Sequence, residues 1–162
     1  MARGNKILIT ENPRGKFFEG IITGTPLPGT VMQIETGTAV DGNGVHTWVV
    51  YQPGTDGDRP VGPIAVALEK GEGFDNTTAY VTGDRGFLYV PLPGDELNMR
   101  WSAAGTGAAD AVTVGLLAVV DTGTGLLVDT TGSPQTEPFV AMEAVDDVTA
   151  TGTLVWCMAT GY

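Results

Sequence analysis

The sequence has few of the side chains that carry most covalent catalysis. Its 162 residues include one cysteine, Cys157, one histidine, His46, and two serines, Ser102 and Ser133. A single cysteine excludes an internal disulfide framework and a zinc site built on cysteines. Cys157 is expected to be a buried structural thiol, and neither serine lies in the Gly-x-Ser-x-Gly turn of serine hydrolases. We therefore predict a protein that is not an enzyme, with no catalytic residues, no metal and no cofactor.

Positive charge is also scarce, and it is unevenly distributed. The chain has 8 Lys and Arg residues against 19 Asp and Glu residues, a net charge of −11, which argues against nucleic acid as a partner. Four of the basic residues lie in the first sixteen positions: Arg3, Lys6, Arg14 and Lys16. We interpret residues 1–16 as a basic arm that contacts an acidic neighbour, such as a second copy of the chain. An ordinary solvated terminus is the alternative.

Long apolar runs are absent. The longest one, residues 112–120, is interrupted by Thr113 and Gly115 and is too short to cross a bilayer. The apolar run near the N-terminus, residues 7–9, is too short for a signal peptide. We expect a protein that is made in the cytoplasm and has no membrane partner.

Short apolar runs bounded by turn residues make up the rest of the chain. With 24 glycines and 10 prolines, the sequence shows no helical periodicity and favours strands joined by tight turns. In residues 96–101 the alternation places Leu97, Met99 and Trp101 on one face. The predicted strands are residues 17–22, 30–35, 46–51, 63–69, 79–82, 87–90, 96–101, 111–120, 126–129, 139–144 and 153–159.

These strands predict an all-β protein with a single β-barrel or a jelly-roll-like sandwich. Strands at this spacing are typical of closed barrels and two-sheet sandwiches. No linker divides the chain and no internal repeat is visible in the sequence. We therefore predict one β domain over residues 17–162, preceded by the N-terminal basic arm of residues 1–16.

Three patterns resemble functional motifs, and each has a simpler structural explanation. Asp121-Thr122-Gly123 matches the tripeptide of aspartic proteases, but those enzymes need a second such aspartate, so we interpret it as a hairpin turn. Residues 41–44 and 56–58 offer oxygen ligands for Ca²⁺, yet neither continues to the glutamate that completes an EF-hand. We interpret both as solvated acidic turns and leave bound calcium open. Residues 105–107 lack the lysine and the helix of a phosphate loop.

Three neighbouring segments carry a resemblance to a known family. They are residues 62–69 (GPIAVALE), the pairs Ala79-Tyr80 and Gly83-Asp84, and residues 89–97 (YVPLPGDEL). Together they resemble the head decoration (cement) proteins of tailed bacteriophages, which are small all-β proteins made in many copies. The similarity covers about forty of the 162 residues, and its motifs are mainly turns.

The resemblance implies a structural protein of the virion. Such a protein binds the major capsid protein on the outer surface of the phage head and stabilises the shell by bridging capsomers. It also implies a homotrimer, by analogy with the three-fold sites of capsids, and a dimer or a monomer in solution stays open. Under this hypothesis Phe17, Phe18 and the four basic residues of the arm contact the capsid or a neighbouring subunit.

Two other functions stay open at this point. A phage fibre or host-glycan-binding β module would expose aromatic side chains such as Trp48 or Tyr51 around a groove. An enzyme or a ligand-binding barrel would place a deep pocket with converging polar groups near His46 or Asp121. Otherwise we expect His46 to be a surface or half-buried side chain.

Overall fold

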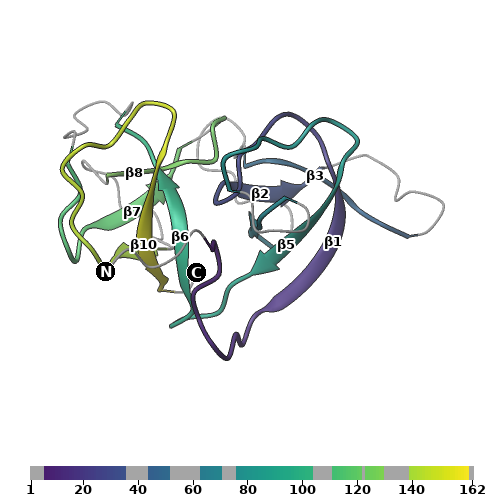
Figure 1. The fold of residues 1–162 in the computed structure, drawn as a ribbon. Coiled ribbons are helices and arrows are strands. Elements are labelled where there is room, and N and C mark those ends of the chain that lie inside the picture. Colours follow the sequence, from purple (N-terminus) through teal and green to yellow (C-terminus); the bar gives the residue numbers. More distant parts are fainter. Residues whose placement is uncertain are drawn as a thin grey trace.

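The protein consists of two small β-barrels that lie side by side (Figure 1). The computed structural model describes residues 6–35, 44–51, 63–70, 76–103, 111–121, 123–129 and 139–160. Within these ranges all regular secondary structure is β-strand, so the predicted all-β barrel class is confirmed. The prediction of a single barrel is wrong, because the strands close into two separate five-stranded sheets.

The first barrel is built from the N-terminal half of the chain. Its strand order is β1-β3-β2-β4-β5, and β5 returns to pair with β1. The β1–β3 pair is parallel and the other four pairs are antiparallel. The strands are β1 (Lys16–Ile22), β2 (Val31–Ile34), β3 (Thr47–Val50), β4 (Ala65–Ala67) and β5 (Arg85–Val90).

The second barrel is built from the C-terminal half. Read from β6, its order is β6-β8-β7-β9-β10, and β10 returns to pair with β6. Here the β6–β8 pair is parallel and the other four pairs are antiparallel. The strands are β6 (Glu96–Trp101), β7 (Leu117–Val120), β8 (Leu127–Asp129), β9 (Phe139–Ala141) and β10 (Thr153–Ala159).

The two barrels therefore repeat one topology. Strand by strand, β1 to β5 correspond to β6 to β10, with the same neighbours and the same directions. The structure thus contains a repeat of topology, although no repeat is visible in the sequence. The repeat is defined by the pairing of backbones, not by particular side chains. Because apolar side chains of many kinds can fill the inside of a barrel, the two halves share the strand order without a visible sequence repeat.

The inside of the first barrel is a compact apolar cluster that requires two glycines. Gly20 on β1 and Gly86 on β5 lie opposite each other. A Cβ at Gly20 would lie 2.2 Å from Cδ1 of Trp48, and a Cβ at Gly86 would lie 2.9 Å from Cε1 of Tyr80. The two glycines make room for the two large rings. The cluster comprises Ile22, Met32, Trp48, Ala65, Ala67, Tyr80 and Leu88.

A second cluster fills the second barrel and continues between the barrels. From the first barrel it includes the outward-facing Val31, Val66 and Tyr89, and from the second barrel it includes the inward-facing Leu97 and Met99. The backbone also joins the two halves, because the amide of Val31 donates to the carbonyl oxygen of Gly125 over 2.8 Å. The two barrels share a core and form one packed unit.

Arg100 on β6 links loops of both barrels. Its guanidinium is buried and donates to the carbonyl oxygens of Pro28 and Gly152, both at 2.9 Å, and of Asn76. Pro28 and Asn76 belong to connections of the first barrel, and Gly152 belongs to the β9–β10 connection. Burial lowers the pKa of Arg100, but a guanidinium remains charged at neutral pH. The side chain acts as a clamp between the barrels.

Two of the predicted strands differ most from the structure, and those of residues 63–69 and 139–144 shorten to β4 and β9. Residues 79–82 form no strand, because Tyr80 turns inward and its hydroxyl donates to the carbonyl oxygen of Leu68 over 2.9 Å. Burial, together with the nearby carboxylates of Glu69 and Asp84, raises the pKa of Tyr80 to about 12. In the predicted strand of residues 111–120, only β7 is a strand, and Val112 forms an isolated bridge.

Candidate interaction surface

The largest exposed aromatic side chains of the described residues lie on the outer side of β1 and β5. Phe17 and Phe87 are 54% and 61% exposed. Phe17 pairs with Tyr89 across the two strands, with ring centroids 4.9 Å apart, and Glu19 pairs with Phe87. Because alternate residues of a strand face the same side, Phe17 and Phe87 are diagonal neighbours on one outer face. We call this pair the β1–β5 patch.

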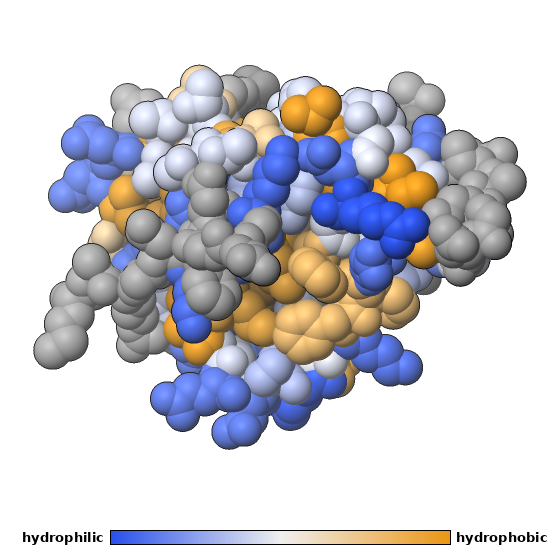
Figure 2. Space-filling model, turned by 45° about the vertical axis from the view of Figure 1, so that its right-hand side comes forward, coloured by the Kyte–Doolittle hydropathy of each residue, from blue (hydrophilic) through white to orange (hydrophobic). Residues whose placement is uncertain are grey.

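Polar groups border the β1–β5 patch. The guanidinium of Arg85 donates to the carboxylate of Glu19 over 2.9 Å at one end, and Lys16 is exposed at the other end of β1. Figure 2, which brings the first-barrel side forward, shows apolar surface near the middle of this face with hydrophilic residues around it. An apolar centre with a polar rim is the usual anatomy of a protein–protein interface.

A buried hydrogen-bond network fixes the segment that leads into β1. The hydroxyl of Tyr89 donates to Oδ2 of Asp95 over 2.6 Å and accepts from the amide of Gly15 over 2.7 Å. The amide of Leu92 also donates to Oδ2 of Asp95, over 2.8 Å. Burial opposes ionisation of Asp95, but hydrogen bonds from Tyr89, Leu92 and Arg14 outweigh it and lower the pKa of the carboxyl. Burial and the bond to Asp95 raise the pKa of Tyr89 to about 12.

From Lys6 onward the predicted arm lies against the two barrels. This network holds its end at β1, and contacts of its own residues hold the rest. Leu8 forms an antiparallel bridge with Leu97, and Ile7 is fully buried. The side chain of Asn98 donates to the carbonyl oxygen of Lys6 over 2.6 Å. In the part of the chain that the structure describes, residues 6–16 therefore line the barrels, and the prediction of a separate arm is not confirmed.

The structure brings only some of the predicted contact residues together. Lys16 and Phe17 are consecutive residues of β1 and both are exposed, but they face opposite sides of the strand. Phe18 faces the inside of the first barrel, where its ring lies 6.0 Å from that of Trp48, so it is only partly accessible. The guanidinium of Arg14 donates to the carbonyl oxygen of Pro93. Lys6 is exposed, and Arg3 lies outside the described residues.

Phe87 is the main contact candidate that sequence reasoning missed. It lies in a short run, residues 87–90, whose four residues are all apolar. Such a run does not tell which side faces solvent. The pairing with β1 decides this, because it places Leu88 inside the barrel and Phe87 outside.

The other candidate residues have structural roles where they are described. Asp121 accepts a hydrogen bond from the hydroxyl of Thr124 over 2.6 Å within the β7–β8 turn, as expected for a hairpin. His46 is exposed, as expected, and its carbonyl oxygen accepts from the amide of Ile21. Ser102 is buried and its hydroxyl donates to the carbonyl oxygen of Ala150 over 3.1 Å. Cys157 is fully buried, as predicted, and burial raises the pKa of its thiol.

Several sequence candidates lie wholly or mostly outside the described residues. They are Ser133, the acidic turns of residues 41–44 (of which only Gly44 is described) and 56–58, and residues 105–107. Within the described ranges, no three His, Cys, Asp or Glu side chains gather into a group that could hold a metal ion. The aromatic residues named for a glycan site do not form one there, because Trp48 is buried inside the first barrel and Tyr51 is partly buried. Burial also raises the pKa of Tyr51.

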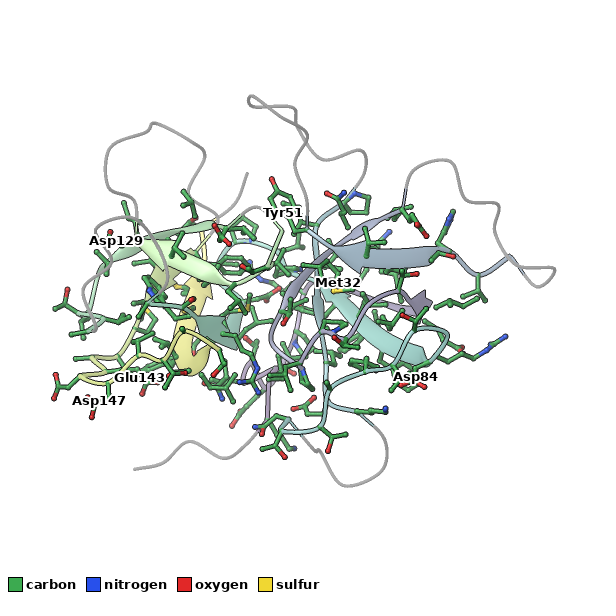
Figure 3. All side chains as sticks on the ribbon, turned by 90° about the horizontal axis from the view of Figure 1, so that it is seen from above. Met32, Tyr51, Asp84, Asp129, Glu143 and Asp147 are labelled. Carbon is green, nitrogen blue, oxygen red and sulfur yellow. The ribbon has the colours of Figure 1, made fainter. Side chains whose placement is uncertain are left out.

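Lysine and arginine are unevenly distributed between the two halves of the chain. No lysine or arginine follows Arg100 in the sequence, whereas seven acidic residues do. Figure 3 shows three of them, Asp129, Glu143 and Asp147, on the second barrel. The lysines and arginines of the described residues therefore lie in the N-terminal segment, in the first barrel and its connections, and at Arg100 of the clamp.

In comparisons with known proteins, no family model and no curated protein matches the chain. Among the described residues, no helix of the length and apolar character needed to span a bilayer occurs.

Proposed function

We propose that this chain is a structural, non-enzymatic protein of a tailed-bacteriophage virion that binds the outer surface of the head. There it binds the major capsid protein and stabilises the shell by bridging capsomers, as a homotrimer. The proposal rests on the sequence resemblance and on one structural observation, the β1–β5 patch. Exposed neighbouring phenylalanines with a polar rim are suited to a protein partner.

The segments that carry the resemblance are close to this patch. Residues 62–69 contain β4, and residues 89–97 contain the end of β5, the connection between the barrels and the start of β6. Tyr89 lies beneath Phe17, and Asp95 holds the entry into β1 through Tyr89. The resembling turns thus support the strand that presents Phe17.

A first experiment measures how many copies of the chain a virion contains. Density-purified virions from the source are analysed by quantitative mass spectrometry against the major capsid protein. A copy number comparable with that of the major capsid protein supports a shell component. A small fraction of that number indicates a fibre, tail or vertex part, and complete absence rejects the virion hypothesis.

A second experiment tests the patch itself. The double variant Phe17→Ser/Phe87→Ser is expected to lose binding to undecorated heads by at least about tenfold, because each buried phenylalanine contributes roughly 1.5–3 kcal/mol. Val114→Ser on the second barrel is the matched control, since Val114 is 66% exposed and lies far along the chain from the patch. Equal loss in both variants, or none in either, would contradict the assignment.

A further inference from the structure

Among the residues that the structure describes, the first part of β1 is an open sheet edge. The amide of Ile21 donates to the carbonyl oxygen of His46 on the β3 side, and the amide of Ile22 donates to that of Asp84 on the β5 side. Since backbone groups alternate along a strand, the amides and carbonyls of Phe17 and Glu19 face the β3 side. However, β3 pairs with β1 only at Ile21 and Ile22. In the described structure, nothing pairs with the outward backbone groups of Phe17 and Glu19.

The corresponding edge of the second barrel is filled. There β8 pairs with β6 only at Trp101, which leaves the first part of β6 open in the same way. The N-terminal segment occupies that edge antiparallel to β6. The amide of Ile9 donates to the carbonyl oxygen of Glu96 over 2.9 Å, and the amide of Asn98 donates to that of Ile7 over 2.7 Å.

The repeat shows which groups correspond. Ile22 pairs with β3 at the bridge equivalent to that of Trp101 with β8, so four residues earlier Phe18 corresponds to Leu97. Both of these side chains face the inside of their barrels, and on either side of them Phe17 corresponds to Glu96 and Glu19 to Asn98. The carbonyl of Phe17 and the amide of Glu19 are thus equivalent to the two groups that bind the added segment in the second barrel. An unpaired edge of this kind is a template for a further strand.

The surroundings of the edge indicate the chemistry of that strand. Phe17 and Phe87 provide an apolar outer face, and Lys16 and Arg14 are exposed at its beginning. The charge of Glu19 is compensated by Arg85. Nε of Arg14 lies 4.0 Å from Oδ1 of Asp95, so the positive charge of this region is mainly that of Lys16. In a chain of net charge −11 this edge favours an acidic strand with apolar side chains, and the like charges of two Lys16 residues disfavour pairing of β1 with β1 of a second copy.

We propose that the open edge of β1 binds an extended acidic segment of the shell protein, which adds to the first barrel as an antiparallel strand. Main-chain hydrogen bonds to Phe17 and Glu19 provide affinity, and the β1–β5 patch and Lys16 provide selectivity. The identity of the partner rests on the proposed function, whereas the strand-accepting edge is a property of the fold.

The test removes one outward hydrogen-bond donor. Glu19→Pro deletes an amide that faces the open edge, so the pairing of β1 with β5 keeps its hydrogen bonds. Glu19→Val is the matched control, because it also loses the charge but keeps the amide. Binding to undecorated heads is expected to fall at least about tenfold for Glu19→Pro and to change little for Glu19→Val. Binding by Glu19→Pro equal to that of the unmodified chain overturns the proposal and leaves the proposed function intact.

A second measurement needs no variant that could misfold. Amide hydrogen exchange of Phe17 and Glu19 is followed in the unmodified chain with and without heads. Slower exchange at both amides supports strand addition, and unchanged exchange in bound protein overturns it. If the chain dimerises in solution and Glu19→Pro is monomeric, the occupant is a second copy and the shell assignment is wrong.

A peptide probe separates the edge from the proposed function. It comprises residues 6–12 of this chain with Lys6→Glu, the segment type that fills the β6 edge, and carries a fluorophore. Its control carries Ile9→Pro in addition, which removes the donor used at β6. Binding of the probe to the unmodified chain, but not to Glu19→Pro, supports the edge even where heads are not bound. No difference between probe and control overturns strand addition.

Discussion

Replacement of Arg100 by methionine tests whether the two barrels depend on the clamp between them. The change removes three hydrogen bonds from a buried cation to the carbonyls of Pro28, Gly152 and Asn76. Each orphaned carbonyl costs about 1–3 kcal/mol. Methionine fills much of the volume, and loss of the buried charge recovers part of its desolvation cost. We therefore expect the free energy of unfolding to fall by about 3–5 kcal/mol.

The assay is urea unfolding, followed by tryptophan fluorescence and by circular dichroism. Trp48 reports on the first barrel and Trp101 on the second, so one shared transition in the unmodified chain indicates that the barrels unfold together. Arg85→Met is the control, because the exposed ion pair of Arg85 with Glu19 is worth at most about 1 kcal/mol. A stability of Arg100→Met within about 1 kcal/mol of the unmodified chain would refute the clamp.

Two further changes probe the first barrel and its connection to the second. Gly20→Ala places a Cβ 2.2 Å from Cδ1 of Trp48, so we expect overpacking to lower the free energy of unfolding by about 1–3 kcal/mol. The measurement is the urea midpoint, which should fall; an unchanged midpoint would argue against the packing described. Because the pKa of Asp95 is lowered in the folded state, its contribution is present above the usual value of 3.8 and is lost as pH falls through the lower folded pKa. The stability of Asp95→Asn should therefore depend less on pH below about 4 than that of the unmodified chain, and parallel pH profiles would contradict the role of Asp95.

The alternation of apolar and polar residues is enough to predict which side of a strand faces a core. In β6 the alternation correctly places Leu97, Met99 and Trp101 in a core. It also suggests that Asn98 and Arg100 face solvent, but both are buried, because the N-terminal segment covers Asn98 and connections of the first barrel cover Arg100. Such burial is a contact between distant segments, and no local pattern records it.

For the candidate surface, too, the local pattern predicts part of the structure and the pairing of distant strands decides the rest. Alternation indicates that Phe17 and Phe18 face opposite sides of a strand, but only the pairing of β1 with β5 shows which one is outside. The four basic residues near the N-terminus suggested a free arm. The apolar Ile7 and Leu8 among them bring that segment onto β6 instead. The repeated topology could not be seen in the sequence, because closure of a barrel depends on pairings between residues far apart in the chain.

The core that the barrels share has a consequence for the order of events during synthesis. The first barrel has all of its strands once residue 90 has been made, yet Val31 and Val66 face outward from it. Leu97, Met99 and the other residues of their cluster in the second barrel are translated later. A nascent chain that ends after β5 therefore presents an apolar face that favours aggregation or chaperone binding. Translation of the second half supplies the residues that cover this face.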